Sequence, residues 1–144
     1  MKKDIPILLV EDDDVDVENV VRAFEENGIV NPLYVAQHGE EALQLLRFGP
    51  PEAAYPEPLC PGLILLDINM PIMNGIELLG HLKQDPALRS IPVVVLTTSQ
   101  EETDRQESFK HSVAGYIIKP VEFSDFVNAV RVVEQYWTLS ESAT

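Results

Sequence analysis

Cysteine and basic residues are scarce in this chain of 144 residues, and each scarcity excludes a class of protein. The only cysteine is Cys60, so no disulfide can form within the chain, and the composition fits a reducing compartment. We interpret Cys60 as a bystander thiol rather than a redox switch. Ten lysine and arginine residues stand against 24 aspartate and glutamate residues, which gives a net charge of −14. Because nucleic acid binding requires a basic surface, this balance argues against a nucleic acid partner and favours basic or mixed protein surfaces.

Long hydrophobic runs are also missing. The first apolar stretch, Ile7–Val10, is only four residues long and ends at acidic residues, which is too short for a signal peptide or a membrane span. We therefore predict a cytoplasmic protein without a membrane partner. The length is that of one domain, which we expect to have its core at about residues 5–137 and a frayed tail at residues 138–144.

Short apolar runs alternate with longer segments of helical periodicity along the chain. Strands are predicted at residues 7–10, 33–36, 63–66, 93–96 and 116–118. Helices are predicted from Asp13 or Asp14 to just before Gly28, and at about residues 40–48, 76–85, 101–112 and 122–137. This alternation is the pattern of βαβ units, so we expect an α/β protein with a parallel sheet.

Three of these segments stand out by composition. The helix at residues 101–112 is almost wholly polar, so we expect it to be held weakly and to be an element that shifts. Residues 49–62 carry too many prolines for a helix or a strand and are predicted to form a long loop. The last helix carries an apolar core stripe and, apart from it, a second patch made of Ala129, Val132 and Tyr136.

Polar residues directly follow four of the predicted strands. They are Glu11 and Asp12 after the first, Asp67 after the third, Thr97 after the fourth and Lys119 after the fifth. Because the carboxyl ends of parallel strands meet at one edge of a sheet, we expect these side chains to form a single site. Three adjacent carboxylates repel one another unless a cation neutralises them, and a set of oxygen ligands suits Mg²⁺. A carboxylate beside Mg²⁺, a lysine and a hydroxyl is equipped to accept a phosphoryl group.

Each of these residues also has an ordinary explanation when it is taken alone. Asp67 can be a turn former, Glu11 and Asp12 can cap the helix that follows them, and Lys119 can be a charge before a turn. Four strand ends that each carry a different group of one phosphoryl-transfer site are an improbable coincidence. We therefore prefer the functional interpretation.

The same residues lie within longer motifs. These are Leu8-Leu9-Val10-Glu11-Asp12, Leu65-Leu66-Asp67-Ile68-Asn69-Met70-Pro71, Val95-Leu96-Thr97-Thr98 and Gly115-Tyr116-Ile117-Ile118-Lys119-Pro120. Through them, about residues 5–135 resemble the receiver domains of two-component response regulators, and in particular the single-domain, chemotaxis-regulator-like members. The proline-rich segment and the aromatic pair Tyr136-Trp137 are more narrowly similar to the regulators that serve bacterial and cyanobacterial phytochromes. The resemblance implies a flavodoxin-like three-layer α/β/α fold with five parallel strands in the order 2-1-3-4-5.

The resemblance also implies the chemistry of the acidic residues. Asp67 would be the phosphoacceptor, and it would receive its phosphoryl group from a sensor histidine kinase. Asp12 and Asp67 would bind Mg²⁺ together with the backbone carbonyl of Asn69, while Glu11 would act mostly through a bound water.

The remaining motif residues would bind the phosphoryl group and change conformation after it is transferred. Lys119, aimed by a cis peptide bond before Pro120, would neutralise the phosphoryl oxygens. Thr97 would turn its hydroxyl onto the phosphoryl group, and Tyr116 would rotate inward behind it. Thr98 is bulkier than the residue usual at its position, so access to the phosphoryl group would be narrower.

We therefore expect a phosphorylation-controlled switch that assists its own phosphorylation and dephosphorylation, rather than an enzyme. Its output would come from a downstream target or from a homodimer formed through Ala129, Val132 and Tyr136. Two alternatives remain open. A Mg²⁺-dependent phosphohydrolase with an aspartate nucleophile is the first, although that class needs a second aspartate where Asn69 stands. A receiver-like interaction module without phosphorylation is the second. The proline-rich segment is either a tolerated loop or a determinant of kinase choice.

Overall fold

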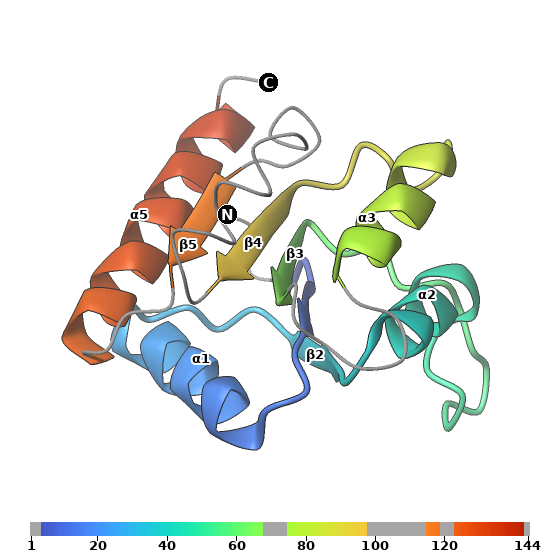
Figure 1. The fold of residues 1–144 in the computed structure, drawn as a ribbon, viewed down its shortest axis with the longest axis horizontal. Helices are drawn as coiled ribbons and strands as arrows, with labels where there is room; N and C mark the ends of the chain where they lie inside the picture. Colours follow the sequence, from blue (N-terminus) through green and yellow to red (C-terminus); the bar gives the residue numbers. More distant parts are fainter. Residues whose placement is uncertain (1–3, 68–74, 98–114, 119–122, 143–144) are drawn as a thin grey trace.

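The computed structural model describes residues 4–67, 75–97, 115–118 and 123–142, and for Thr97, Tyr116, Ile118 and residues 136–142 it describes the backbone alone. Within these ranges, strands alternate with helices up to the fourth strand, and the described elements that follow are a fifth strand and a last helix (Figure 1). The strands are β1 (Ile7–Val10), β2 (Leu33–Ala36), β3 (Leu63–Asp67), β4 (Val93–Thr97) and β5 (Gly115–Ile118). The helices are α1 (Asp14–Glu26), α2 (Gly39–Phe48), α3 (Gly75–Gln84) and α5 (Phe123–Ser142). The helix predicted at residues 101–112 lies outside the described residues.

All five strands pair in parallel, in the order β2-β1-β3-β4-β5. Ile7 of β1 lies opposite Leu33 of β2 and Leu63 of β3, so these three strands begin level with one another. Helices α1 and α5 cover one face of the sheet, and α2 and α3 cover the other (Figure 1). The predicted flavodoxin-like three-layer fold is confirmed.

Alternate residues of the central strands face opposite layers. In β1, Leu8 and Val10 pack with the core under α2 and α3, whereas Ile7 and Leu9 pack with the core under α1 and α5. Strand β3 divides its side chains in the same way. A strand that is buried on both faces needs apolar residues at every position, which explains why these strands read as unbroken apolar runs.

Helix α1 begins at an aspartate cap, close to the start predicted at Asp13 or Asp14. The side chain of Asp13 accepts hydrogen bonds from the backbone N–H groups of Val15, at 2.8 Å, and Asp16, at 3.1 Å. These bonds satisfy N–H groups that have no partner within the helix. Asp14 and Asp16 add negative charge to the first turn, at the positive end of the helix dipole.

Helices α1 and α5 are joined by polar contacts as well as by apolar packing. The guanidinium of Arg22 lies 4.3 Å from the centre of the Phe123 ring, which is a cation–π contact. The side-chain amide of Asn27 donates to the backbone carbonyl of Val127 at 3.0 Å and accepts a hydrogen bond from Arg131 at 3.3 Å. These contacts set the position of α5 against α1 at more than one point along the helix.

The proline-rich segment forms a closed loop whose two ends are held by one carbonyl group. The carbonyl of Leu45 in α2 accepts hydrogen bonds from Gly49, at 3.0 Å, and from Leu59, at 2.9 Å. Gly49 has a φ of 87°, and a Cβ atom there would overlap the carbonyl oxygen of Glu57, so only glycine lets the chain cross itself at this point. The side chain of Leu59 is buried in the core under α2 and α3. Residues 49–58 are thus a compact Ω-loop on a fixed base.

Helix α5 is longer than predicted. It runs to Ser142, so the expectation of an end near Trp137 was wrong. The predicted fraying of residues 138–144 stays a prediction. Residues 138–142 include no glycine or proline, so nothing in the sequence interrupts the helix there. Although α5 is the longest described helix, neither it nor any other described helix is both long and apolar enough to span a membrane.

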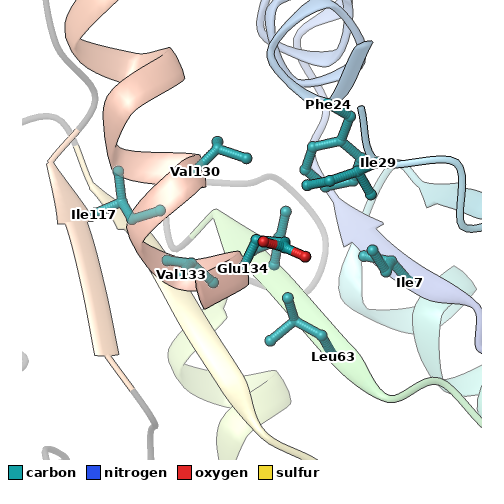
Figure 2. A pocket seen from close by; sticks show the side chains of 9 residues that line it. Ile7, Phe24, Ile29, Leu63, Ile117, Val130, Val133 and Glu134 are labelled. Carbon is teal, nitrogen blue, oxygen red and sulfur yellow. The ribbon is translucent and has the colours of Figure 1, made fainter. Parts of the chain in front are cut away.

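A small cavity lies between α1, α5 and the sheet (Figure 2). Its volume is about 20 Å³, and it is lined by side chains that include Ile7, Leu63, Phe24, Val130 and Val133. A trapped water needs two to four polar partners, and Glu134 is the one charged residue in this lining. The cavity is therefore a local packing defect beneath α5, and its lining is apolar except for Glu134.

We predict that Val133→Ile stabilises the protein, because the added methyl group enters this cavity. The free energy of unfolding, measured by urea denaturation, should rise by about 1 kcal/mol. Val15→Ile is the matched control, because Val15 lies in the neighbouring helix α1 and is 64% exposed. The control should change stability by less than about 0.5 kcal/mol. Equal effects of the two variants would show that helix propensity, and not the cavity, is responsible.

Candidate functional site

Three carboxylates meet at the carboxyl ends of β1 and β3. Glu11 and Asp12 follow β1, Asp67 is the last residue of β3, and one carboxylate oxygen from each of them lies within 4.8 Å of the others. The strand register explains this proximity, because Val10 pairs with Leu66 and the next residues on the two strands are Glu11 and Asp67. The structure therefore brings these three predicted site residues together. We call them the acidic cluster.

The members of the acidic cluster differ in burial. Glu11 is 1% exposed and Asp67 is 5% exposed, whereas Asp12 is exposed. A buried carboxylate is costly unless hydrogen bonds or a cation compensate for its lost hydration. The backbone N–H of Asp13 donates to the carboxylate of Glu11 at 3.2 Å and supplies part of this compensation. Two buried carboxylates beside a third still favour the arrival of a cation.

The turn from β1 into α1 holds Glu11 in place. Its backbone N–H donates to the carbonyl of Ala36 at 2.9 Å, which extends the pairing of β1 with β2 by one residue. Asp13 then ties the turn to α1, because its N–H bonds to Glu11 while its side chain caps the helix. The sequence predicted that the helix starts at Asp13 or Asp14, but it did not indicate that Asp13 also donates a hydrogen bond to Glu11.

The donor set of the acidic cluster fits a hard divalent cation. Carboxylate oxygens are the ligands that Mg²⁺ and Mn²⁺ prefer, whereas zinc and copper sites usually include histidine or cysteine. Glu11, Asp12 and Asp67 are the described residues able to hold such an ion together. Asn69, whose carbonyl was predicted as a further ligand, lies outside the described residues.

The other predicted site residues are described only in part. Thr97 ends β4, and because Asp67 pairs with Leu96, Thr97 stands one residue beyond it at the same edge of the sheet. Tyr116 pairs with Val95 in the β4–β5 ladder. The side chains of Thr97 and Tyr116 are not described, and Thr98, Lys119 and Pro120 lie outside the described residues. Their predicted roles stay predictions.

The structure describes the side chains of two of the three residues in the dimer patch predicted on α5. Val132 is 63% exposed, but Ala129 is partly buried and packs against the core under α1 and α5. The prediction treated Ala129 as separate from the core stripe, and this was wrong because the helix sits deep enough for small side chains beside the stripe to reach the core. The side chain of Tyr136 is not described.

Comparison with known proteins gives a family match over most of the chain. Residues 7–131 match the family described as response regulator receiver domain. Rcp1 of Synechocystis sp. is 37% identical over 131 residues, which are 91% of this chain and 87% of Rcp1. The probable methanogenesis regulatory protein FilR2 of Methanothrix harundinacea is 36% identical over 131 residues, which are 91% of this chain and 82% of FilR2.

Solved structures of similar proteins share the fold. The bacteriophytochrome response regulator RtBRR is 44% identical with a TM-score of 0.76, over 88% of this chain and 76% of that one. The cyanobacterial phytochrome response regulator RcpA, in its phosphorylated form, is 34% identical with a TM-score of 0.77, over 94% of each chain. The Mn²⁺-bound form of Rcp1 is 36% identical with a TM-score of 0.76, over 92% of this chain and 94% of that one. Response regulators of phytochrome systems are thus prominent among the relatives, although FilR2 is named for another process.

We predict that Asp12→Asn stabilises the metal-free protein, because it removes one of three mutually repelling charges. In EDTA at low salt, the free energy of unfolding should rise by about 0.5–1 kcal/mol, and added salt should shrink the gain. Asp14→Asn removes the same charge from the first turn of α1, where an acid is favourable, and should give no gain. A lower stability of Asp12→Asn in EDTA would contradict repulsion within the acidic cluster.

Proposed function

This chain belongs to the response regulator receiver domain family, and on that premise we propose that it is a switch phosphorylated on Asp67 by a sensor histidine kinase in a Mg²⁺-dependent reaction. The observation that carries the proposal is the acidic cluster, with its carboxylate oxygens within 4.8 Å of one another. Two comparisons add support, because similar regulators have been solved in a phosphorylated form and with Mn²⁺ bound. The net charge of −14 supports protein partners over nucleic acid.

Asp67 is the best placed of the three carboxylates to act as the acceptor. It lies on the central strand β3, which is paired on both sides with β1 and β4, so its backbone cannot turn away from an incoming phosphoryl group. Such fixed orientation lowers the entropic part of a reaction barrier. Asp12 is exposed in the turn after β1, and Glu11 is the most buried of the three, so both suit metal binding better than attack on phosphorus.

In the proposed reaction, a carboxylate oxygen of Asp67 attacks the phosphorus of a phosphohistidine in the kinase. The new P–O bond forms as the P–N bond breaks, and the imidazole leaves in line with the attack. A bound Mg²⁺ would supply positive charge to the phosphoryl oxygens. Glu11 and Asp12 would hold that ion beside Asp67, and Lys119 would add its ammonium group from the end of β5. Because the chain is consumed as the acceptor and is not a turnover catalyst, it is a switch rather than an enzyme.

The switch itself is proposed to run through the residues at the ends of β4 and β5. Thr97 stands one residue beyond Asp67 at the same edge of the sheet, where its hydroxyl would bond to the new phosphoryl group. Tyr116 lies on the strand next to Thr97 and would turn inward behind it. This rearrangement would change the surface formed by β5 and α5.

We propose a phytochrome-type kinase as the source of the phosphoryl group. Similarity to RtBRR, RcpA and Rcp1 supports this choice. The test is a comparison of phosphotransfer rates from a panel of purified, phosphorylated histidine kinases with and without chromophore-binding regions. Preferential transfer from a kinase without such a region would overturn the choice of a phytochrome-type kinase while leaving the receiver function intact.

We predict that acetyl phosphate with Mg²⁺ adds one phosphoryl group to the wild-type chain and none to Asp67→Asn. Intact-mass measurement after a short reaction detects the product, and treatment with EDTA beforehand should abolish labelling, because the acidic cluster then holds no cation. Asp14→Asn is the matched control, since it changes a nearby acid outside the cluster, and it should be labelled like the wild type. Equal labelling of Asp67→Asn would show that the acceptor lies elsewhere.

We further propose a homodimer formed through α5, supported by the exposed Val132 on that helix. Analytical ultracentrifugation should show a dimer for the wild type and a monomer for Val132→Asp combined with Tyr136→Ala. Val30→Asp is the control, because Val30 is 65% exposed but lies just before β2, at the opposite edge of the sheet. A monomeric wild type in both phosphorylation states, or a dimer that tolerates the double substitution, would remove this interface.

A further inference from the structure

The Ω-loop at residues 49–58 presents an aromatic side chain to solvent. Tyr55 is 91% exposed, whereas the other exposed large hydrophobic residues in the described part of the chain are 36–65% exposed. Phe48, the last residue of α2 at the base of the loop, is 59% exposed. Tyrosine is enriched at the energetic centres of protein interfaces, because it combines a large apolar area with a polar tip.

The base of the loop is rigid. The Leu45 carbonyl binds both ends, the chain crosses itself at Gly49, and Leu59 is anchored in the core. A surface held in this way loses little conformational entropy when a partner binds, which favours recognition over a freely moving loop. The geometry of the base thus presents Tyr55 from a fixed support.

The loop and the acidic cluster lie at opposite ends of the sheet. The chain leaves the base of the loop at Leu59 and enters β3 at Leu63, whereas β3 ends at Asp67. The base of the loop therefore lies toward the amino end of β3 and the acidic cluster at its carboxyl end, and these two ends are about 13 Å apart. The loop extends beyond α2 and away from α1 and α5 (Figure 1). A protein bound to the loop therefore leaves the carboxyl edge of the sheet open for phosphotransfer.

The supports of the loop do not include the residues that would change with phosphorylation. They belong to α2, to the start of β3 and to the core between them, whereas Asp67 and Thr97 stand at the other end of their strands. A surface that is the same in both states binds a partner equally in both, and such binding cannot shift the equilibrium between them. The loop is therefore suited to recruitment of the partner that delivers the phosphoryl group, and not to output.

The charges of the loop specify the chemistry of that partner. Its charged residues are Glu52 and Glu57, both exposed, and the whole chain carries a net charge of −14. The same loop of a second copy would be repelled by these glutamates, whereas lysine and arginine side chains would be attracted. The complementary surface is an apolar pocket for one aromatic ring, bordered by basic groups.

We propose that residues 49–58 form a phosphorylation-independent docking surface for the sensor kinase, in which Tyr55 enters an apolar pocket with a basic rim. This proposal rests on the proposed function, because it assigns a second contact to the same kinase. The contact raises the effective concentration of Asp67 at the kinase without taking part in the chemistry.

The first test separates binding from chemistry. With the full-length phosphorylated kinase that transfers fastest to the wild-type chain, Tyr55→Ser should raise KM about tenfold and leave kcat unchanged, because docking is lost equally in the ground and transition states. Tyr55→Phe should retain most of the affinity. Tyr34→Ser, on the edge strand β2, is the control for loss of a partly exposed tyrosine and should behave like the wild type. An unchanged KM for Tyr55→Ser overturns the proposal.

The second test does not depend on phosphotransfer. Calorimetric titration of the same kinase with Asp67→Asn, with and without Tyr55→Ser, measures docking even if Asp67 is not the acceptor. The proposal requires binding that the tyrosine substitution weakens about tenfold. In the wild type, kinase binding should also slow alkylation of Cys60, the single and exposed cysteine close to the loop. The docking surface is overturned if the kinase binds Asp67→Asn equally well with and without Tyr55→Ser, if it binds neither variant, or if it does not slow alkylation of Cys60. Failure of acetyl phosphate to label Asp67 would instead contradict the proposed function alone.

Discussion

Electrostatic repulsion among Glu11, Asp12 and Asp67 is the constraint around which this protein is organised. The folded chain holds three negative charges within 4.8 Å of one another and buries two of them, which costs free energy in the absence of a cation. The pairing of β1 with β3 forces this proximity, since it is part of the same ladder that buries the core. The stability of the sheet thus compensates for a site that is unfavourable by itself. A divalent cation is then the natural partner of that site.

The two layers of helices serve this arrangement in different ways. On one face, α1 starts at the acidic cluster and is tied to α5 by the Arg22–Phe123 contact and by the hydrogen bonds of Asn27. The cavity beneath α5 leaves that side less tightly filled. On the other face, α2 and the loop after it are closed by hydrogen bonds to the Leu45 carbonyl. The layer next to the proposed output surface is therefore the one with space to adjust, while the layer that carries the loop is fixed.

In a parallel sheet, the carboxyl ends of the strands lie at one edge and the amino ends at the opposite edge, so the two edges can serve different functions. The turns at the carboxyl ends of the strands carry the acidic cluster, and the connections at the amino ends are free to vary without disturbing it. The Ω-loop uses this freedom, because it enters β3 at the end opposite to Asp67. Features that all receiver domains need and features that distinguish one regulator from another can therefore occupy different surfaces of one small domain.

The sequence by itself determined the elements whose signals are local. The apolar runs predicted the strands, Asp13 predicted the start of α1, and the motifs around Asp67 indicated the family, because each signal lies within a few adjacent residues. Only the tertiary structure decided the rest. The hydrogen bond between Asn27 and Val127 joins residues 100 positions apart, and the Leu45 carbonyl closes a loop whose sequence showed only its high proline content. Helix α5 is longer than predicted, and Ala129 is more buried than predicted. Such contacts depend on how whole elements pack against one another, and the hydrophobic periodicity of one helix or strand does not show which other elements lie next to it.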